Sequence, residues 1–316
     1  MASEKIANTL SVREMIDEKM TKDKKGGSLQ KAVPFLLFII AAVSVLTTIG
    51  IVLTLIFETI LFFQSVSFKE FLTAEKWYPF SETHASYGIL PLISGTLRVT
   101  AIAVIVAVPI GLAAAIYLSE YASDRARRII KPIFEVLAGI PTIVYGYFAL
   151  TFVTPVLREI IPGLAVFNAL SPGIVIGIMI TPMIASLSED AMSSVPNAMR
   201  EGALALGSTK IEVAFKVVLP AAISGVVASI VLAISRAIGE TMIVSVAGGS
   251  SPNLGWNVTE SIQTMTAYIV QVSQGDVGYG TTIYYSIYAV GMTLFVFTLI
   301  MNFIAQYVSR RFREEY

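Results

Sequence analysis

The chain has 316 residues, of which 55% are hydrophobic and only 14% are charged, and its mean hydropathy is +0.75. Soluble domains carry about 25% charged residues, so a soluble enzyme of this length is excluded. The net charge is zero, so the chain lacks the positive field that nucleic-acid binding requires. No cysteine and a single histidine exclude disulfides, thiolate chemistry and histidine-rich metal clusters. We therefore expect an integral membrane protein.

Long runs without charged residues predict where the chain crosses the membrane. A spanning helix needs about 20 apolar residues, and only helices or closed barrels satisfy their backbone groups in lipid. The runs show no strand-like alternation, so the sequence predicts an all-α protein with six transmembrane helices. These lie at residues 33–60, 90–118, 134–157, 168–188, 218–247 and 281–308, and Pro and Gly interrupt the second, fourth and fifth.

The predicted helices divide the chain into four parts. These are a cytoplasmic tail (1–31), the first helix with its outer loop (32–86), a five-helix core (87–308) that contains a cytoplasmic loop (190–216), and a cytoplasmic tail (309–316). The first apolar run is much longer than the core of a cleaved signal peptide, about 7–15 residues, so we expect a permanent helix. For the mixed-charge stretch 12–25, a solvated and partly mobile tail is favoured over a surface helix.

The distribution of Lys and Arg predicts the orientation. Of 22 such residues, 17 lie in the N-terminal tail, in 125–131, in 189–216 and in the C-terminal tail, and three lie in the other loops. Cationic loops remain in the cytoplasm, so both termini and the loop 189–216 are expected there. The remaining two are Arg98, near the outer end of the second span, and Arg236, inside the fifth. We expect Arg98 to extend to the lipid headgroups rather than to line an outer vestibule.

The loop between the fourth and fifth spans carries signals for two short helices. Ser194 and Pro196 form a hydroxyl–proline start for a helix that is expected to stop at Gly207. Thr209, with Glu212 three residues later, fits a capping box that opens a second helix. Two short helices joined by a glycine predict a compact knob on the cytoplasmic face, and a plain connector is the alternative.

The same loop resembles a known motif. The pattern Glu201-Gly202-Ala203-(x3)-Gly207-(x9)-Val217-Val218-Leu219-Pro220 resembles the EAA loop of the membrane subunits of binding-protein-dependent ABC importers, with Gly202 in place of alanine and Val217 in place of isoleucine. The resemblance implies a type I (MetI-like) permease core in which Glu201, Gly202, Ala203 and Gly207 dock into a separate ATPase. It agrees with the absence of a P-loop motif from the sequence. We expect no cofactor and no enzymatic activity in this chain, because ATP and Mg would be bound by the partner ATPase.

A narrower resemblance concerns two further segments. Residues 236–244 (Arg-Ala-Ile-Gly-Glu-Thr-Met-Ile-Val) and 138–146 (Ala-Gly-Ile-Pro-Thr-Ile-Val-Tyr-Gly) are similar to the first of the two membrane subunits of phosphate-specific ABC importers, the PstC family. The resemblance covers about residues 87–308. It implies inorganic phosphate as the substrate, and as partners a second permease subunit (PstA-like), two copies of an ATPase subunit (PstB-like) and an extracytoplasmic phosphate-binding protein.

Arg236 and Glu240 are the candidate residues of the substrate pathway. Counted from Pro220, Arg236 lies ~24 Å along the predicted helix, where a cation costs at least ~2.5–3.5 kcal/mol. Glu240 follows four residues later, so the two side chains would share one helix face and neutralise each other. Because a guanidinium matches two phosphate oxygens, we expect Arg236 to contact the anion and Glu240 to pair with Arg236 in the empty pathway. The alternative is an ion pair that only holds helices together.

Two other functions remain open. One is an ABC permease for another oxyanion, such as sulfate or molybdate, or for a small solute, and the segment 236–241 argues against it. The other is a secondary transporter or channel that works without partners, which the EAA-like loop argues against. Gly173 and Gly177 in the fourth span predict a close-packing surface. The outer loop 248–280 lacks Lys and Arg, and it suits either docking to an extracellular partner or dipping into the membrane.

Overall fold

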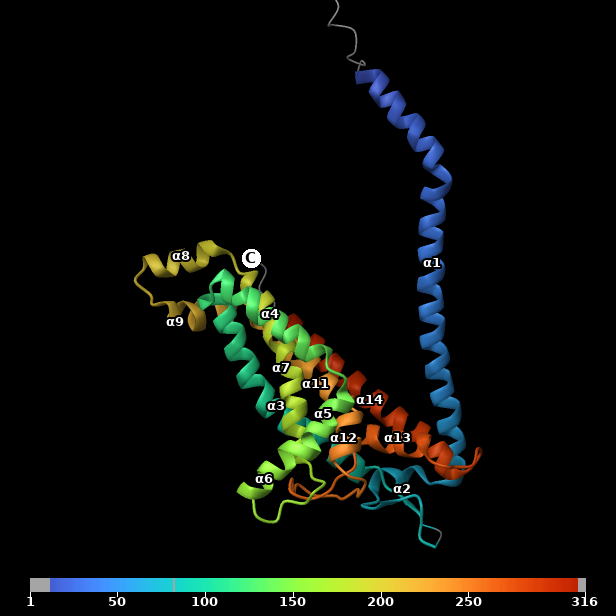
Figure 1. Cartoon of the computed structure of the whole chain (residues 1–316). Coiled ribbons are helices and arrows are strands. Elements are labelled where there is room, and N and C mark those ends of the chain that lie inside the picture. The colour runs from blue at the N-terminus through green and yellow to red at the C-terminus, as the bar shows by residue number, and fades with distance from the viewer. Residues whose placement is uncertain (1–11, 82, 312–316) are drawn as a thin grey trace, which may run out of the picture. The chain divides into compact units, whose positions relative to one another are not determined.

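The computed structural model describes residues 12–81 and 83–311, and this part of the chain is mostly helical (Figure 1). Five of its helices are long and apolar enough to cross a membrane, and a bent pair of helices makes a sixth candidate. The predicted all-α membrane protein is therefore confirmed. One small sheet is added, in which β1 (Trp77–Tyr78) pairs antiparallel with β2 (Ser86–Tyr87).

The chain forms two compact units, which meet at residues 57 and 58. Residues 12–57 of the helix α1 (Val12–Ser65) make up the described part of the first unit, and from Val33 to Phe57 the apolar side chains are largely exposed, as in a helix that faces lipid. The span predicted at 33–60 lies within α1, which begins at Val12, so the stretch 12–25 is helical and the preference for a tail over a helix there is wrong. This stretch is rich in Glu, Lys and Met, which favour helix, and it contains neither Gly nor Pro. Residues 1–11 of the predicted tail lie outside the described residues.

Two helices form the centre of the second unit, α3 (Leu90–Ile116) and α7 (Leu170–Ser193), and a π-helical turn (Tyr117–Tyr121) extends α3. They pack closely where α7 has glycine. A Cβ atom at Gly173 would lie 2.7 Å from Cβ of Ile102, and one at Gly177 would lie 2.9 Å from the carbonyl oxygen of Ala103. The predicted glycine packing surface is confirmed, and both helices contain most of the spans predicted at 90–118 and 168–188.

The third predicted span, 134–157, begins too early. Its first residues belong to the amphipathic helix α4 (Asp124–Gly139), and the spanning segment runs from Thr142 to Ile160 through α5 (Thr142–Phe148), a π-helical turn (Ala149–Val153) and α6 (Thr154–Ile160). Between α4 and α5, Ile140 has an extended backbone because it precedes Pro141. The chain therefore turns within what the sequence presents as one charge-free run.

The fifth predicted span, 218–247, is not one helix. Its spanning part is α11 (Ile223–Ile238), which follows α9 (Lys210–Val213), a π-helical turn (Ala214–Val218) and α10 (Leu219–Ala221), and the helix axis bends by 74° between the two parts. A second break at Gly239 separates α11 from α12 (Met242–Ala247). The first break falls at Ala222, whose φ of −92° and ψ of 3° leave the α-helical region. The second has a local cause, because Gly239 lowers helix propensity.

The last span is α14 (Thr282–Arg311), whose apolar part runs from Thr282 to Ile304 and confirms the prediction of 281–308. Part of the outer loop 248–280 forms the helix α13 (Met265–Gln274). Tyr268 in α13 is fully buried in a cluster of edge-to-face aromatic rings with Trp77 and its neighbours Phe71 and Tyr87, beside α2 (Phe68–Thr73). Trp256 and Tyr279 of the same loop are exposed. The loop is thus partly integrated into the second unit and partly free.

Candidate functional site

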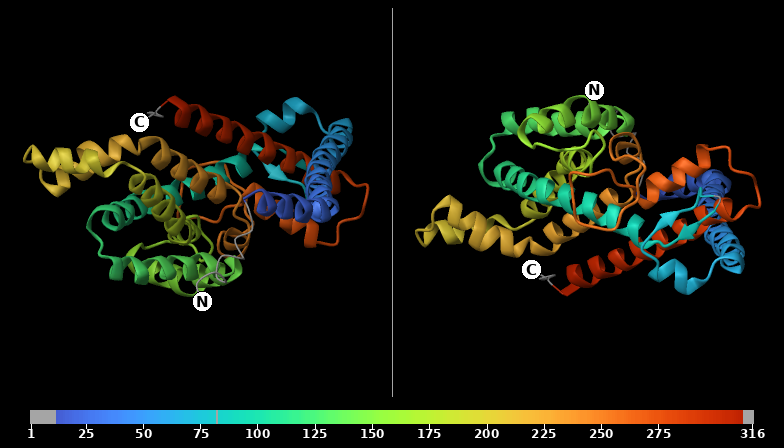
Figure 2. Two further views of the ribbon diagram at one scale, coloured as in Figure 1. Left: turned by 90° about the horizontal axis from the view of Figure 1, so that it is seen from above. Right: turned by 90° about the horizontal axis from the view of Figure 1, so that it is seen from below.

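The loop after α7 forms the predicted knob, in which α8 (Asn197–Ala205) is followed by α9. Gly207 ends the first helix with φ of +89°, a left-handed conformation that glycine adopts without strain. The capping box is present, because the backbone N–H of Thr209 donates to Oε2 of Glu212 at 3.0 Å and Oγ1 of Thr209 accepts from the N–H of Glu212 at 3.4 Å. These hydrogen bonds, together with Lys216, lower the pKa of Glu212 to about 2. The two-helix knob is therefore confirmed, at one end of the second unit (Figures 1 and 2).

The residues predicted to dock into an ATPase lie on α8 and at its end. Glu201, Gly202 and Gly207 are exposed, and Ala203 is half-buried. A Cβ atom at Gly202 would meet nothing within 4 Å, so this face of α8 is open. Leu206 is 90% exposed at the same end. The geometry leaves a surface that another protein can cover.

A buried ion pair ties α8 to the rest of the second unit, and sequence reasoning missed it. The Arg200 guanidinium lies 3.2 Å from Oε1 of Glu120 in the π-helical turn after α3. It also donates to the carbonyl oxygens of Met192, at 2.7 Å, and Val195 at the end of α7. Arg200 and Glu120 side chains are only 15% and 10% exposed. Arg200 therefore connects the knob to both central helices.

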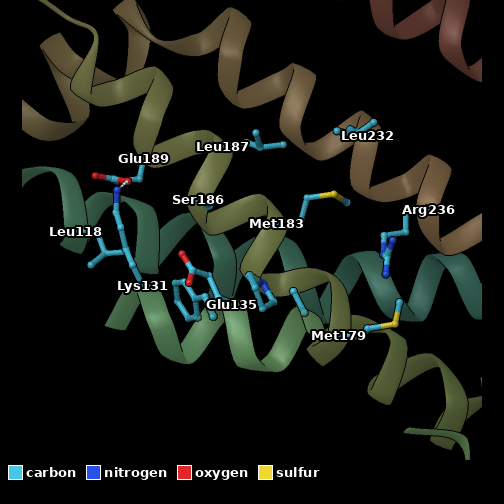
Figure 3. Close-up of a pocket in the computed structure, with 13 residues that line it drawn as sticks. Leu118, Lys131, Glu135, Met179, Met183, Ser186, Leu187, Glu189, Leu232 and Arg236 are labelled. Carbon is cyan, nitrogen blue, oxygen red and sulfur yellow. Dashed lines mark ion pairs between the residues drawn. The ribbon is translucent and has the colours of Figure 1, made fainter. Parts of the chain in front are cut away.

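Arg236 lines a cavity of about 510 Å³ (Figure 3). The lining residues come from α4, α7 and α11 with Leu118 of the π-helical turn, and they include Phe134, Met179, Met183 and Leu232. Arg236 is exposed, and among the described residues none forms an ion pair with its guanidinium. Because α11 begins at Ile223, Arg236 lies ~20 Å along the spanning helix, less than the ~24 Å expected from Pro220.

The predicted pairing of Arg236 with Glu240 is wrong for this structure, because the helix break at Gly239 removes the shared face. Glu240 lies beyond the end of α11, and its Oε1 accepts hydrogen bonds from the backbone N–H groups of Met242, at 3.1 Å, and Ile243, at 3.4 Å. Its side chain is largely buried, and its carbonyl oxygen accepts from Thr266. Glu240 therefore caps the start of α12.

The structure brings the segments 138–146 and 236–244 together. The helix α5 packs against α12, and a Cβ atom at Gly146 would lie 3.2 Å from Cα of Ile243. Ala138 and Arg236, at the first positions of the two segments, line the same cavity. The two motifs thus form one site, although about 90 residues separate them along the chain.

The prediction that Arg98 extends to the lipid headgroups is wrong. Arg98 is 1% exposed, and its guanidinium donates to the carbonyl oxygens of Asn257, at 2.9 Å, and Asn253, at 2.7 Å, and to Oδ1 of Asn253 at 2.6 Å. The backbone of Gln263 also lies close to Gly95, one turn earlier on α3. A Cβ atom at Gly95 would lie 2.3 Å from the Gln263 carbonyl oxygen. Arg98 therefore clamps the outer segment 253–263 onto α3.

A second pair of charges in the cavity was also missed. Nζ of Lys131, on α4, lies 2.6 Å from Oε2 of Glu189, on α7, and both residues line the cavity with Glu135 (Figure 3). The Glu189 side chain is 3% exposed. A carboxylate near the end of a long apolar run was the available signal, but its partner is 58 positions earlier in the chain. Among the described residues, no cluster of three or more His, Asp or Glu could hold a metal ion.

Residues 107–314 match the model of the family described as "Binding-protein-dependent transport system inner membrane component". A Bacillus subtilis protein described as a probable ABC transporter permease, YqgH, is 34% identical over 246 residues, which are 78% of this chain and 79% of that protein. The phosphate transport system permease protein PstC of Mesorhizobium japonicum is 34% identical over 260 residues, which are 76% of this chain and 78% of that protein.

Two solved structures share the fold. A chain of a bacterial alginate ABC transporter aligns with a TM-score of 0.61 and 17% identity, over 93% of this chain and 98% of that chain. A chain of the MetNI methionine ABC transporter in inward-facing conformations aligns with a TM-score of 0.53 and 18% identity, over 72% of this chain and 95% of that chain. The predicted type I (MetI-like) permease fold is therefore confirmed.

Proposed function

This chain belongs to the family of inner membrane components of binding-protein-dependent transport systems, and we propose that it is a permease subunit of an ATP-driven importer of inorganic phosphate. The proposal rests on the cavity residue Arg236, whose guanidinium has no acidic partner among the described residues. The relatives named as phosphate permeases support the choice of substrate. Sulfate and molybdate permeases are the alternatives that the experiment below addresses.

The chemistry of Arg236 suits phosphate. An intramembrane arginine costs at least ~2.5–3.5 kcal/mol, and such residues mark transport pathways. The guanidinium offers parallel N–H donors that match two oxygens of a phosphate. Because Glu240 accepts from the start of α12 and does not line the cavity, it does not neutralise Arg236 in this conformation. Arg236 is the residue that would contact the passing anion.

Import of this anion requires an energy source. Moving one negative charge inward against the membrane potential costs about 2.3 kcal/mol per 100 mV, so a doubly charged phosphate at ~150 mV faces about 7 kcal/mol. The proposed source is a pair of ATPase subunits (PstB-like), which bind ATP and Mg and dock against Glu201, Gly202, Ala203 and Gly207. A second permease subunit (PstA-like) and an extracytoplasmic phosphate-binding protein complete the assembly. The positive-inside rule supports a cytoplasmic position for both termini and the knob.

The proposed cycle uses the bonds that hold the knob. Closure of the ATPase pair would move α8, and Arg200 would transmit the movement to the ends of α3 and α7. Because α4, α7 and α11 line the cavity, their movement would open Arg236 to one side of the membrane and then to the other.

Uptake of labelled phosphate tests the proposal in phosphate-starved cells that lack this gene. Wild type should restore uptake that excess sulfate does not inhibit. A Glu201→Lys/Gly207→Asp variant should insert in the membrane without restoring uptake, and Tyr279→Phe, an exposed site far from α8 in sequence, serves as the matched control. The substrate assignment would be refuted if wild type failed to restore phosphate uptake. It would also be refuted if excess sulfate inhibited the uptake as strongly as the same excess of unlabelled phosphate.

A further inference from the structure

The cavity that contains Arg236 has a second cation at its other end. Lys131 and Glu189 lie together at one end in Figure 3, and Arg236 lies at the other. Glu189 is near the end of α7, which leads directly into the knob. On the basis of the proposed function, we propose that Lys131 is a second anion-binding residue, which receives the phosphate after Arg236 and releases it at the end of the cavity nearer the knob.

The Lys131 ammonium has N–H donors that can bind a passing anion. It carries three N–H donors and no acceptor. Oε2 of Glu189 is 2.6 Å away, and Oδ1 of Asp190 is 4.0 Å away, at the limit of an ion pair. The Lys131 side chain is 42% exposed, whereas that of Glu189 is 3% exposed. The Lys131 ammonium forms an ion pair with Glu189, while its partly exposed N–H groups remain available to an anion in the cavity.

The charges of the cavity wall favour release of a bound anion over tight binding. Lys131 and Arg236 are balanced by Glu135 and Glu189, so the empty cavity is neutral. Glu135 follows Lys131 by four residues on α4, so the two side chains lie on one helix face. An anion at Lys131 therefore competes with the neighbouring carboxylates, whereas no described residue forms an ion pair with Arg236. Lysine also contacts phosphate as a point charge, without the bidentate geometry of arginine, which favours release.

A structural role is the competing explanation. No residue of α4 is buried, so the ion pair between Lys131 and Glu189 contributes to holding α4 on α7. Loss of uptake on simple replacement of Lys131 would fit either role. The binding role and the structural role make different demands on a cation at position 131. A binding residue needs a cation that faces the cavity, whereas a structural link needs only that the buried carboxylate is not left alone.

Because the chain contains no cysteine, Lys131→Cys gives this subunit one thiol. The complete transporter, assembled with cysteine-free partner subunits, is treated with a methanethiosulfonate reagent that attaches an aminoethyl, a methyl or a sulfonatoethyl group. Uptake by the unmodified variant should fall about 10-fold, the effect of one lost charge-assisted hydrogen bond. Only the aminoethyl group, which restores an ammonium, should return uptake to near the wild-type rate. Arg128→Cys is the matched control, because Arg128 is an exposed cation of α4 that does not line the cavity.

Two further measurements separate binding from structure. Phosphate should slow modification of the Lys131→Cys thiol, and sulfate at the same concentration should slow it less. In the double variant Lys131→Met/Glu189→Met, both charges are absent, so no buried carboxylate is left unpaired. This variant should insert and hydrolyse ATP at the wild-type rate while phosphate uptake remains about 10-fold low.

Each contrary result has a distinct meaning. Recovery of uptake in the double variant, or equal uptake with the aminoethyl and methyl groups, would overturn the role of Lys131 and leave the phosphate importer intact. A wild-type transporter that carries no phosphate would refute both proposals.

Discussion

Replacing Arg98 with methionine should release the segment 253–257 from α3 without unfolding the second unit. In the structure the guanidinium donates to three oxygens of Asn253 and Asn257 at 2.6–2.9 Å, and no carboxylate forms an ion pair with it among the described residues. Methionine fills a similar stem volume but has no donor. Because Asn253 is half-buried and Asn257 exposed, water replaces part of each bond, and about 1 kcal/mol is lost per acceptor. The total is about 3 kcal/mol, or about 100-fold in the opening equilibrium.

A cysteine at position 262 reports the opening, because Nδ2 of Asn253 donates to the carbonyl oxygen of the adjacent Ser261 at 2.8 Å. Ile262 is fully buried and its N–H donates to the carbonyl oxygen of Gly248 at 2.9 Å. In a chain otherwise free of cysteine, the thiol of Ile262→Cys is modified only when the segment opens. Arg98→Met should therefore raise its modification rate about 100-fold. Arg98→Lys keeps the charge but lacks the several fixed N–H donors of the guanidinium, and it should give an intermediate rate.

Ile180→Cys on α7 is the control, because Ile180 is equally buried but belongs to the central helix pair. Its modification rate should not change when Arg98 is replaced. An unchanged rate at Ile262→Cys would show that Arg98 does not hold the segment. Equal acceleration at both sites would show that Arg98 supports the whole unit instead.

Four further predictions concern the knob and the break after α11. Arg200→Met leaves the buried carboxylate of Glu120 unpaired, at a cost of about 3 kcal/mol. It should lower the number of phosphate ions imported per ATP hydrolysed, and Glu120→Met in the same chain should restore part of the loss. Glu240→Ala removes the cap of α12 and should lower thermal stability by about 1 kcal/mol, whereas Glu240→Gln keeps an acceptor oxygen and should lose less; equal losses would contradict the capping role. Thr209→Ala should speed amide hydrogen exchange in α9 about 5-fold. Because the pKa of Glu212 is lowered from 4.5 to about 2, the stabilising contribution of its charge is present above about pH 4.5 and is lost as pH falls toward 2. Exchange protection in wild-type α9 should accordingly stay constant from pH 8 to pH 5, and a loss within that range would contradict the capping geometry.

Local signals predicted the knob because its causes are local. Gly207 ends α8 through its own backbone conformation, and the hydrogen bonds between Thr209 and Glu212 involve residues three apart. The spans were predicted by composition, which detects long apolar segments but not the breaks within them. Composition does not show whether a Pro or Gly within such a segment ends the helix. The expected pairing of Arg236 with Glu240 assumes a helix that continues through Gly239, whereas the structure breaks there and also between α4 and α5, before Pro141.

The contacts that shape the site could not be predicted, because their partners are far apart in the chain. Lys131 and Glu189 meet only because α4 returns to the end of α7, and Arg200 reaches Glu120 across 80 positions. Arg98 is 155 positions from Asn253. Its burial with neutral acceptors runs against the usual behaviour of a cation near a membrane surface. Tertiary packing decides such cases, and the sequence supplies only the residue types.

Accumulation of labelled phosphate by proteoliposomes that contain the complete transporter and ATP tests the central claim most directly. We predict that wild type accumulates phosphate against its gradient, that excess sulfate has little effect, and that Arg236→Gln hydrolyses ATP but accumulates about 10-fold less phosphate. Arg236→Lys should retain part of the activity, because it keeps the charge without the bidentate geometry. Equal accumulation by wild type and Arg236→Gln would contradict the assignment of Arg236 to the phosphate pathway.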